Sequence, residues 1–408
     1  MSSSSSNAGP RAEANVSSNA RALRKLRGVL NLQDFEHRAR RHLPRPLFEY
    51  VAGTVEDGRA GRDNQQALLE YGLLPRILTD VSGRSQKVEL FGRTYDSPFG
   101  IAPMGLAALT AYRGDIVLAR AARAANIPAV LSGTSVIPLE SVMDEVPGTW
   151  FQAYLPGDSE RIAALLDRVA RTGCDTLVVT VDIPVNANRE NNIRAGFSTP
   201  LKPSLRLAWD GLTRPSWLLG TFLRTLARHG MPHFENSFAT RGAPILSATV
   251  LRDFSARDHL NWRHFAEIRR QWRGNLVIKG ILHPADARLA REHGADAVIV
   301  SNHGGRQLDG AISPLRSLQA VVAAVPDLPV LVDSGFRRGS DVMVALAMGA
   351  RMVFVGRPFN YAAAIAGEAG VAHAINLLRE EIDRNMGMLG INRCDELTPA
   401  CLVPRTVS

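Results

Sequence analysis

The sequence predicts an α/β protein built on a (β/α)8 barrel, the TIM barrel fold, with an N-terminal helical extension and a long insertion after the fourth strand. From about residue 98, short apolar runs rich in β-branched residues alternate with amphipathic segments, the pattern of buried parallel strands joined by helices. Eight such strand–helix units follow one another, which favours a closed barrel over an open sheet. Polar groups stand after each apolar run, where a barrel carries its chemistry.

The chain is expected to start with a disordered tail, residues 1–29, because the stretch up to about Asn19 is rich in Ser, Ala and Asn and has no apolar core. Residues 30–408 then form one domain, with the barrel at about 98–390. Leu30–Ala52 has the pattern of two short helices. Asn31 or Asp34 can cap the first helix, and Gly53 is a plausible cap after the second.

The barrel strands and their helices are expected at defined places. The strands are predicted at Phe99–Ala102, Pro128–Ser132, Thr149–Ala153, Thr176–Val181, Leu276–Lys279, Ala297–Ser301, Pro329–Asp333 and Met352–Gly356. Amphipathic helices are predicted at Ile116–Ala125, Ser159–Arg171, Pro284–Glu292, Pro314–Val325 and Gly339–Ala347.

One connection, about residues 183–261, is far longer than an ordinary barrel loop, which indicates a functional insertion. Within it Trp217, Leu218, Phe222 and Leu226 are spaced for one apolar helical face, with arginines interleaved near the end. Such a helix can be a lid or a subunit contact. It can also lie on an anionic membrane, with Trp and Leu inserted and Arg at the headgroups.

Composition narrows the class of protein. The formal charge of +9 suits anionic ligands or surfaces, but no basic stripe with interleaved aromatics indicates nucleic acid. The three cysteines, Cys174, Cys394 and Cys401, have no metal-site spacing and are too few for a disulfide framework. We therefore expect no bound metal, and we expect the protein to lie in the reducing cytoplasm. No stretch has the length of a spanning helix.

The loop after the sixth predicted strand carries the sharpest signal. His303 can move a proton near neutral pH, and Arg306 can hold a carboxylate with two parallel hydrogen bonds. Gly304 and Gly305 allow a tight turn or a close approach to a ligand. Alone, such a pair is more typical of a solvated barrel loop with incidental charges. The seventh and eighth strand ends, with Asp333 onward and Gly356, add the glycine-rich pattern of a barrel phosphate site.

These residues resemble the FMN-dependent α-hydroxy acid dehydrogenase and oxidase family, which includes L-lactate dehydrogenase, glycolate oxidase and (S)-mandelate dehydrogenase. The main resemblance is the run Ser301-Asn302-His303-Gly304-Gly305-Arg306-Gln307-Leu308-Asp309, and it extends from about Leu30 to Pro399. Supporting blocks are Phe151–Tyr154, Thr180–Asp182, Ile278–Gly280, Asp333–Gly339 and Gly356–Pro358.

The resemblance implies a role for each matching residue. His303 is the base, Asp182 pairs with it and favours its charged form, Arg189 and Arg306 clamp the carboxylate, and Tyr50 and Tyr154 bind substrate. FMN is held by Pro103, Met104, Gly105, Ser132, Gln152, Thr180, Lys279 and Ser301 and, at its phosphate, by Asp333, Ser334, Gly335, Phe336, Arg337, Gly356 and Arg357. FMN takes up the electrons, and Lys279 stabilises the reduced ring.

The function expected from this resemblance is oxidation of an L-2-hydroxy acid of the lactate or mandelate type to the 2-keto acid. The alternatives are a catalytically silent flavin- or phosphate-binding barrel and an oxidase that uses oxygen on glycolate-type acids. A quinone, a cytochrome or oxygen is the expected acceptor, and a homo-oligomer, specifically a tetramer, is expected. The mandelate and lactate dehydrogenase branches associate with the inner membrane, the former through this insertion, so a peripheral position on the cytoplasmic face is an additional expectation.

Three positions depart from parts of the family. Ser334 stands where many relatives have Gly. Thr134 replaces the bulky Trp of the glycolate oxidase branch, and Gly105 stands where oxidases often have Ala. Together with Gly133, these small residues predict room for a substrate side chain larger than that of glycolate.

Overall fold

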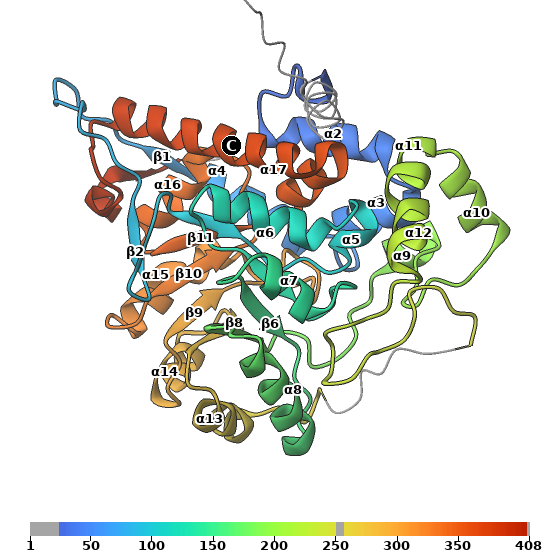
Figure 1. Cartoon of the computed structure of the whole chain (residues 1–408). Coiled ribbons are helices and arrows are strands. Elements are labelled where there is room, and N and C mark those ends of the chain that lie inside the picture. Colours follow the sequence, from blue (N-terminus) through green and yellow to red (C-terminus); the bar gives the residue numbers. More distant parts are fainter. Residues whose placement is uncertain (1–23, 250–256, 406–408) are drawn as a thin grey trace, which may run out of the picture.

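A computed structural model describes residues 24–249 and 257–405 of the chain. Its centre is a sheet of eight parallel strands in the order β4-β11-β10-β9-β8-β7-β6-β5. A parallel bridge between Ile101 and Ala129 joins the first and last strands, so the sheet curls into a nearly closed barrel. This confirms the predicted fold class (Figure 1). The strands are β4 (Phe99–Ile101), β5 (Val130–Ser132), β6 (Trp150–Ala153), β7 (Thr176–Thr180), β8 (Asn275–Ile281), β9 (Ala297–Val300), β10 (Val330–Asp333) and β11 (Met352–Val355).

The barrel interior is filled by side chains. Alternate residues of neighbouring strands point inward, including Trp150, Val178, Val277, Ile299 and Phe354, all of them at most 1% exposed. A short antiparallel hairpin, β2 (Val88–Leu90) and β3 (Arg93–Tyr95), packs into the same cluster. Because one end of the barrel is occupied in this way, ligands can enter only from the carboxyl ends of the strands.

Helices surround the strands and bury their apolar faces in one continuous outer core. They are α5 (Ala107–Thr110), α6 (Gly114–Ala124), α7 (Leu139–Glu145), α8 (Ser159–Arg171), α13 (Trp262–Gln271), α14 (Pro284–Glu292), α15 (Pro314–Ala324), α16 (Gly339–Ala347) and α17 (Arg357–Leu389). The bounds of α8, α14 and α16 are those that the amphipathic pattern predicts. Helix α17 crosses the molecule against α6 and α2 and is broken by non-helical backbone at Ala366 and Gly367 (Figure 1).

The N-terminal extension forms helices α2 (Leu32–His42), α3 (Arg45–Ala52) and α4 (Arg59–Leu69), followed by β1 (Tyr71–Leu73), which pairs with β12 (Leu402–Pro404). Asn31 caps α2 in a capping box completed by Asp34, so both predicted caps act at one helix end. Most of the predicted tail, residues 1–29, lies outside the described residues. At its end Leu26 and Val29 are already buried, so ordered structure begins before residue 30 because these apolar side chains pack on the core.

The insertion adds the helical segments α9 (Glu190–Ala195), α10 (Leu205–Leu212), α11 (Pro215–Trp217), η1 (Leu218–Leu223) and α12 (Arg224–His229) beside the barrel (Figure 1). A π-helical turn, η1, lies inside the predicted apolar helix. Trp217 is buried and its indole N–H donates to the Leu109 carbonyl (2.7 Å), which anchors the insertion to α5. Two short 3-10 turns, Cys394–Glu396 and Pro399–Cys401, lie near the C-terminus. Among the described residues, no helix is long and apolar enough to span a membrane.

Candidate active site

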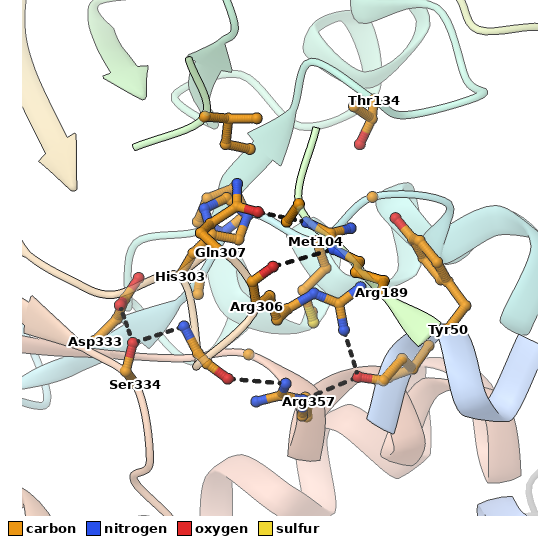
Figure 2. Close-up of a pocket in the computed structure, with 18 of the residues that line it drawn as sticks. Tyr50, Met104, Thr134, Arg189, His303, Arg306, Gln307, Asp333, Ser334 and Arg357 are labelled. Atoms are coloured by element: carbon orange, nitrogen blue, oxygen red, sulfur yellow. Dashed lines mark hydrogen bonds between the residues drawn. The ribbon is translucent and has the colours of Figure 1, made fainter. Parts of the chain in front are cut away.

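A cavity of about 420 Å³ opens at the carboxyl ends of the barrel strands, and most of the predicted site residues line it (Figure 2). The predicted residues in its wall are Tyr50, Pro103, Met104, Gly105, Tyr154, Arg189, Lys279, His303, Arg306, Asp333, Ser334, Gly335, Phe336, Arg337, Gly356 and Arg357. The other predicted residues are Ser132, Gln152, Thr180, Asp182 and Ser301. They are located at or just after strand ends, and four of them are buried. The structure therefore gathers residues from the ends of all eight barrel strands and from α3.

The loop after β9 is shaped by left-handed backbone. His303, Gly304 and Gly305 have φ of 58°, 69° and 72° in succession, a conformation that glycine adopts freely and histidine rarely. At Gly305 an added Cβ would lie 2.5 Å from the backbone nitrogen of Gly61, so only glycine allows this loop to touch α4. Asn302 exchanges two side-chain hydrogen bonds with Asn64 of α4. The turn projects His303 and Arg306 into the cavity.

His303 is held between a carboxylate and a phenol. Its Nδ1 lies 2.9 Å from Asp182 Oδ1, and its Nε2 lies 3.5 Å from the Tyr154 hydroxyl inside the cavity. Burial lowers the pKa of His303 below its usual value, and Asp182 offsets this only in part. Asp182 does favour the charged imidazole, as expected, but the net effect of the site is a neutral His303 near pH 7. A neutral imidazole whose Nδ1–H is fixed by Asp182 presents Nε2 as a proton acceptor.

Arginines surround the opposite side of the cavity. Arg306 donates to the carbonyls of Val51 (3.2 Å) and Gly53 (2.8 Å), and Arg189 donates to the Arg306 carbonyl (3.2 Å). Burial, together with the cations of Arg189 and Arg357, lowers the pKa of Arg306 to about 9, so its guanidinium stays protonated at neutral pH. Arg357 also donates to the carbonyls of Val51, Gly53 and Gly304. These cations create a strongly positive pocket that favours anionic ligands.

A buried lysine connects the barrel floor to this loop. Lys279 Nζ donates to Ser301 Oγ (2.7 Å) and forms an ion pair with Asp333 Oδ2 (3.1 Å). Burial alone would lower the pKa of Lys279, but the carboxylates of Asp333 and Asp182 raise it overall, so the ammonium is retained. Ser334 Oγ donates to Asp333 (2.8 Å) and accepts from the Gly304 N–H (2.9 Å). A chain of hydrogen bonds therefore joins the lysine to the His303 loop.

The barrel floor carries polar atoms with no partner among the described residues. Gln152 Nε2 and Thr180 Oγ1 are buried at the ends of β6 and β7 and make no hydrogen bond, whereas Gln152 Oε1 accepts from Ser132. Buried polar atoms without partners are rare, and a bound ligand or an ordered water can supply the missing partner. A flavin ring, whose edge carries both donors and acceptors, fits such a floor. Gly356 precedes the N-terminus of α17, and Asp333–Arg337 precede α16, as a phosphate site requires.

Sequence reasoning missed several contributors and misplaced one. The cavity is also lined by Asn192 and Phe197, on a segment whose spacing carried no signal, and by Gln307, which stands in the main resemblance run but was given no role. Gly133 was expected to enlarge the cavity but does not line it. An added Cβ there would lie 2.8 Å from the Gln152 carbonyl, so glycine allows close packing against β6 instead. Gly105 and Thr134 do line the cavity.

The comparisons with known proteins agree with one another. The sequence model of a family described as FMN-dependent dehydrogenase matches residues 39–404. The chain is 36% identical to (S)-mandelate dehydrogenase of Pseudomonas putida over 372 residues, covering 91% of this chain and 93% of that protein. It is 40% identical to L-lactate dehydrogenase of Chromohalobacter salexigens over 379 residues, covering 91% and 94%. The crystal structure of the monotopic membrane protein (S)-mandelate dehydrogenase superposes with a TM-score of 0.83 at 35% identity, covering 93% of this chain and all of that one.

Proposed function

The chain belongs to the family of FMN-dependent dehydrogenases, and from that premise we propose that it oxidises an L-2-hydroxy acid through His303 as base and Arg189 and Arg306 as carboxylate clamp. It is an FMN-dependent 2-hydroxy acid dehydrogenase of the lactate and mandelate type. The observation that carries the finer proposal is the position of His303 Nε2, which faces a cavity lined by arginines and lies 3.5 Å from the Tyr154 hydroxyl.

The base is His303, because its surroundings prepare it to accept a proton. Asp182 occupies Nδ1, which leaves Nε2 as the lone-pair nitrogen facing the cavity. Burial keeps the imidazole neutral at pH 7 by lowering its pKa. When Nε2 takes the proton, the imidazolium forms beside Asp182, whose carboxylate stabilises it. Lys279, protonated and buried nearby, supplies positive charge on the flavin side.

The carboxylate of the substrate lies between Arg306 and Arg189. Arg306 already donates to two backbone carbonyls and stacks near Tyr50, with its guanidinium carbon 5.2 Å from the ring centroid. These contacts fix the plane of the guanidinium, which a two-pronged grip on a carboxylate needs. The Tyr154 hydroxyl, 3.5 Å from His303 Nε2, stands where the substrate hydroxyl must approach.

The cofactor FMN, when bound, supplies the acceptor for the two electrons that leave the substrate. Pro103, Met104 and Gly105 would support one face of the ring. Gln152 and Thr180 would satisfy its polar edge, and the cations Arg337 and Arg357 beside the α16 and α17 N-termini would meet its phosphate. The remaining steps belong to the protein: it binds the acid, orients its hydroxyl and accepts the proton.

The experiment is reduction of the bound flavin under anaerobic conditions. Purified protein is expected to carry one noncovalent FMN per chain, and its yellow colour should bleach on adding lactate, mandelate or 4-hydroxymandelate, with glycolate as the small reference acid. The variant His303→Gln should retain FMN yet bleach about 10²–10⁴-fold more slowly. Folded protein that ignores added FMN would exclude the proposal, and a near wild-type rate in the variant would assign His303 a structural role.

We further propose that the insertion attaches the enzyme peripherally to the cytoplasmic face of an anionic membrane and that a membrane carrier accepts the electrons. The supporting observation is the exposed apolar surface of α10 and η1. Leu205 (92% exposed), Trp209 (67%), Leu212 (62%) and Leu219 (65%) face solvent on these helices. Flotation with anionic liposomes tests this against a version in which residues 209–232 are replaced by a polar linker. Intact protein that stays unbound at low salt would make the segment a lid or a subunit contact.

A further inference from the structure

A second cavity of about 260 Å³ separates the insertion from the body of the protein. Its walls come from the inner faces of α10, α11 and η1 on one side and from α3 and α5 on the other. The residues that define it are Leu47, Leu109, Leu207, Gly211, Trp217 and Phe222. No charged residue lines it, and its volume is near the lower end for small-molecule sites. Water gains little in such a space, because it finds almost no hydrogen-bond partners there.

The cavity opens beside the exposed apolar surface of α10. Of its lining residues, Pro203, Ser204 and Ala208 are exposed, so the mouth lies at the start of α10. Leu205 and Trp209, both largely exposed, stand beside this mouth. An apolar surface that leads into an apolar cavity can admit a hydrocarbon chain directly from a membrane without exposing it to water.

The apolar cavity lies next to the active-site cavity along α3 and the α5 segment. Leu47 of α3 lines the apolar cavity, whereas Tyr50 and Val51, one turn further along the same helix, line the active-site cavity. Around α5, Gly105 lines the active-site cavity and Leu109 lines the apolar cavity. Residues three and four apart share one helix face, so the two cavities are neighbours along these segments.

We propose that this cavity binds the prenyl tail of a membrane quinone that accepts the electrons of the reaction. The inference rests on the proposed function, since it assigns the acceptor for that reaction. The step balances: the hydroxy acid loses two electrons and two protons on becoming the keto acid, and the quinone gains the same on becoming the quinol. A quinone suits the position better than a structural lipid, because the cavity lies next to the redox site along α3 and its lining carries no cation for a phosphate headgroup.

Gly211 makes the tail site testable. It lies inside α10, and an added Cβ would meet only the edge of the Trp217 ring at 3.8 Å, an ordinary contact. Gly211→Leu therefore adds side-chain volume to the cavity from a position where the new Cβ makes no clash, and it replaces glycine by a better helix former. Gly220→Leu is the matched control, because Gly220 is exposed and an added Cβ there meets nothing within 4 Å.

The experiment uses the purified, FMN-loaded full chain and two quinones with the same headgroup, one carrying two prenyl units and one carrying a methyl group. In the wild type and Gly220→Leu, the prenyl tail should lower the KM for the quinone about tenfold or more. In Gly211→Leu this advantage should vanish, while the KM for the methyl quinone and the rate of anaerobic bleaching stay unchanged. Binding of the prenyl quinone, followed by quenching of tryptophan fluorescence, should weaken in Gly211→Leu alone.

Three outcomes would overturn the inference. The first is equal KM values for the two quinones in the wild type, and the second is an equal rise in KM for both quinones in Gly211→Leu. The third is that a fatty acid displaces the bound prenyl quinone and the quinone cannot displace the fatty acid in turn. The last would identify a lipid chain as the occupant. Failure of the proposed function is distinguished by the bleaching assay, since a protein that no hydroxy acid reduces fails before any quinone is added.

Discussion

Replacing Asp182 by asparagine tests how the site prepares His303, because the change removes one charge and keeps the shape of the side chain. Asp182 is nearly buried and accepts from His303 Nδ1 at 2.9 Å. A hydrogen bond to a charged group contributes about 1.5–3 kcal/mol, and 1.4 kcal/mol is about tenfold in rate. If the hydrogen bond between His303 and Asp182 stabilises mainly the imidazolium that forms during the reaction, Asp182→Asn should slow proton removal by about 10- to 100-fold.

The pH dependence follows with a definite sign. Asp182 raises the pKa of His303, whereas burial lowers it more strongly. Without the carboxylate, the pKa of His303 should fall further, so the acid limb of the rate profile should move to lower pH while the plateau drops. The assay is stopped-flow bleaching of the FMN-loaded enzyme between pH 5 and 8. Tyr154→Phe is the control, since it removes the neighbour of Nε2 and leaves Nδ1 paired. A plateau within twofold of wild type, or a limb moving to higher pH, would refute the reasoning.

Three other substitutions have expected outcomes. Arg306→Lys should raise the KM for the hydroxy acid and lower kcat, each about tenfold, because an ammonium cannot reproduce the planar grip; unchanged steady-state kinetics would move the clamp to Arg189. In Gly105→Ala the new Cβ would lie 2.2 Å from Thr134 Oγ1 and 2.7 Å from the Tyr50 hydroxyl. It crowds the cavity wall, so the ratio of kcat/KM for mandelate to that for lactate should fall about tenfold; a constant ratio would contradict this. Ser334→Gly should keep the Tm within a few degrees of the wild type, because φ is 84° at this position and glycine adopts it freely. It should lower kcat severalfold, because the Gly304 N–H loses its acceptor, the Ser334 hydroxyl; an unaltered kcat would show that this hydrogen bond is dispensable.

The barrel could be predicted from the sequence because its signals are local. Most strands are short apolar runs rich in β-branched residues, and each of the helices α8, α14 and α16 shows its period within its own residues. The His303 loop and the Arg337 region were likewise visible as polar, glycine-bearing segments after apolar runs. The closing of the sheet makes these strand ends converge, so recognising the fold class was enough to predict that the side chains meet.

Only the tertiary structure decided the properties that depend on distant partners. The neutral state of His303 results from burial exceeding the effect of Asp182, and burial is not readable from the spacing of the two residues. Gly133 looked like room for substrate, yet it serves packing against β6, because the neighbour that decides its role lies on another strand. The cavity at Gly211 exists because α10 and η1 pack against α3 and α5, segments more than 90 residues apart in the chain. The sequence by itself determined which groups stand at the strand ends, whereas the long-range packing of those ends determined their charge, their orientation and the spaces between them.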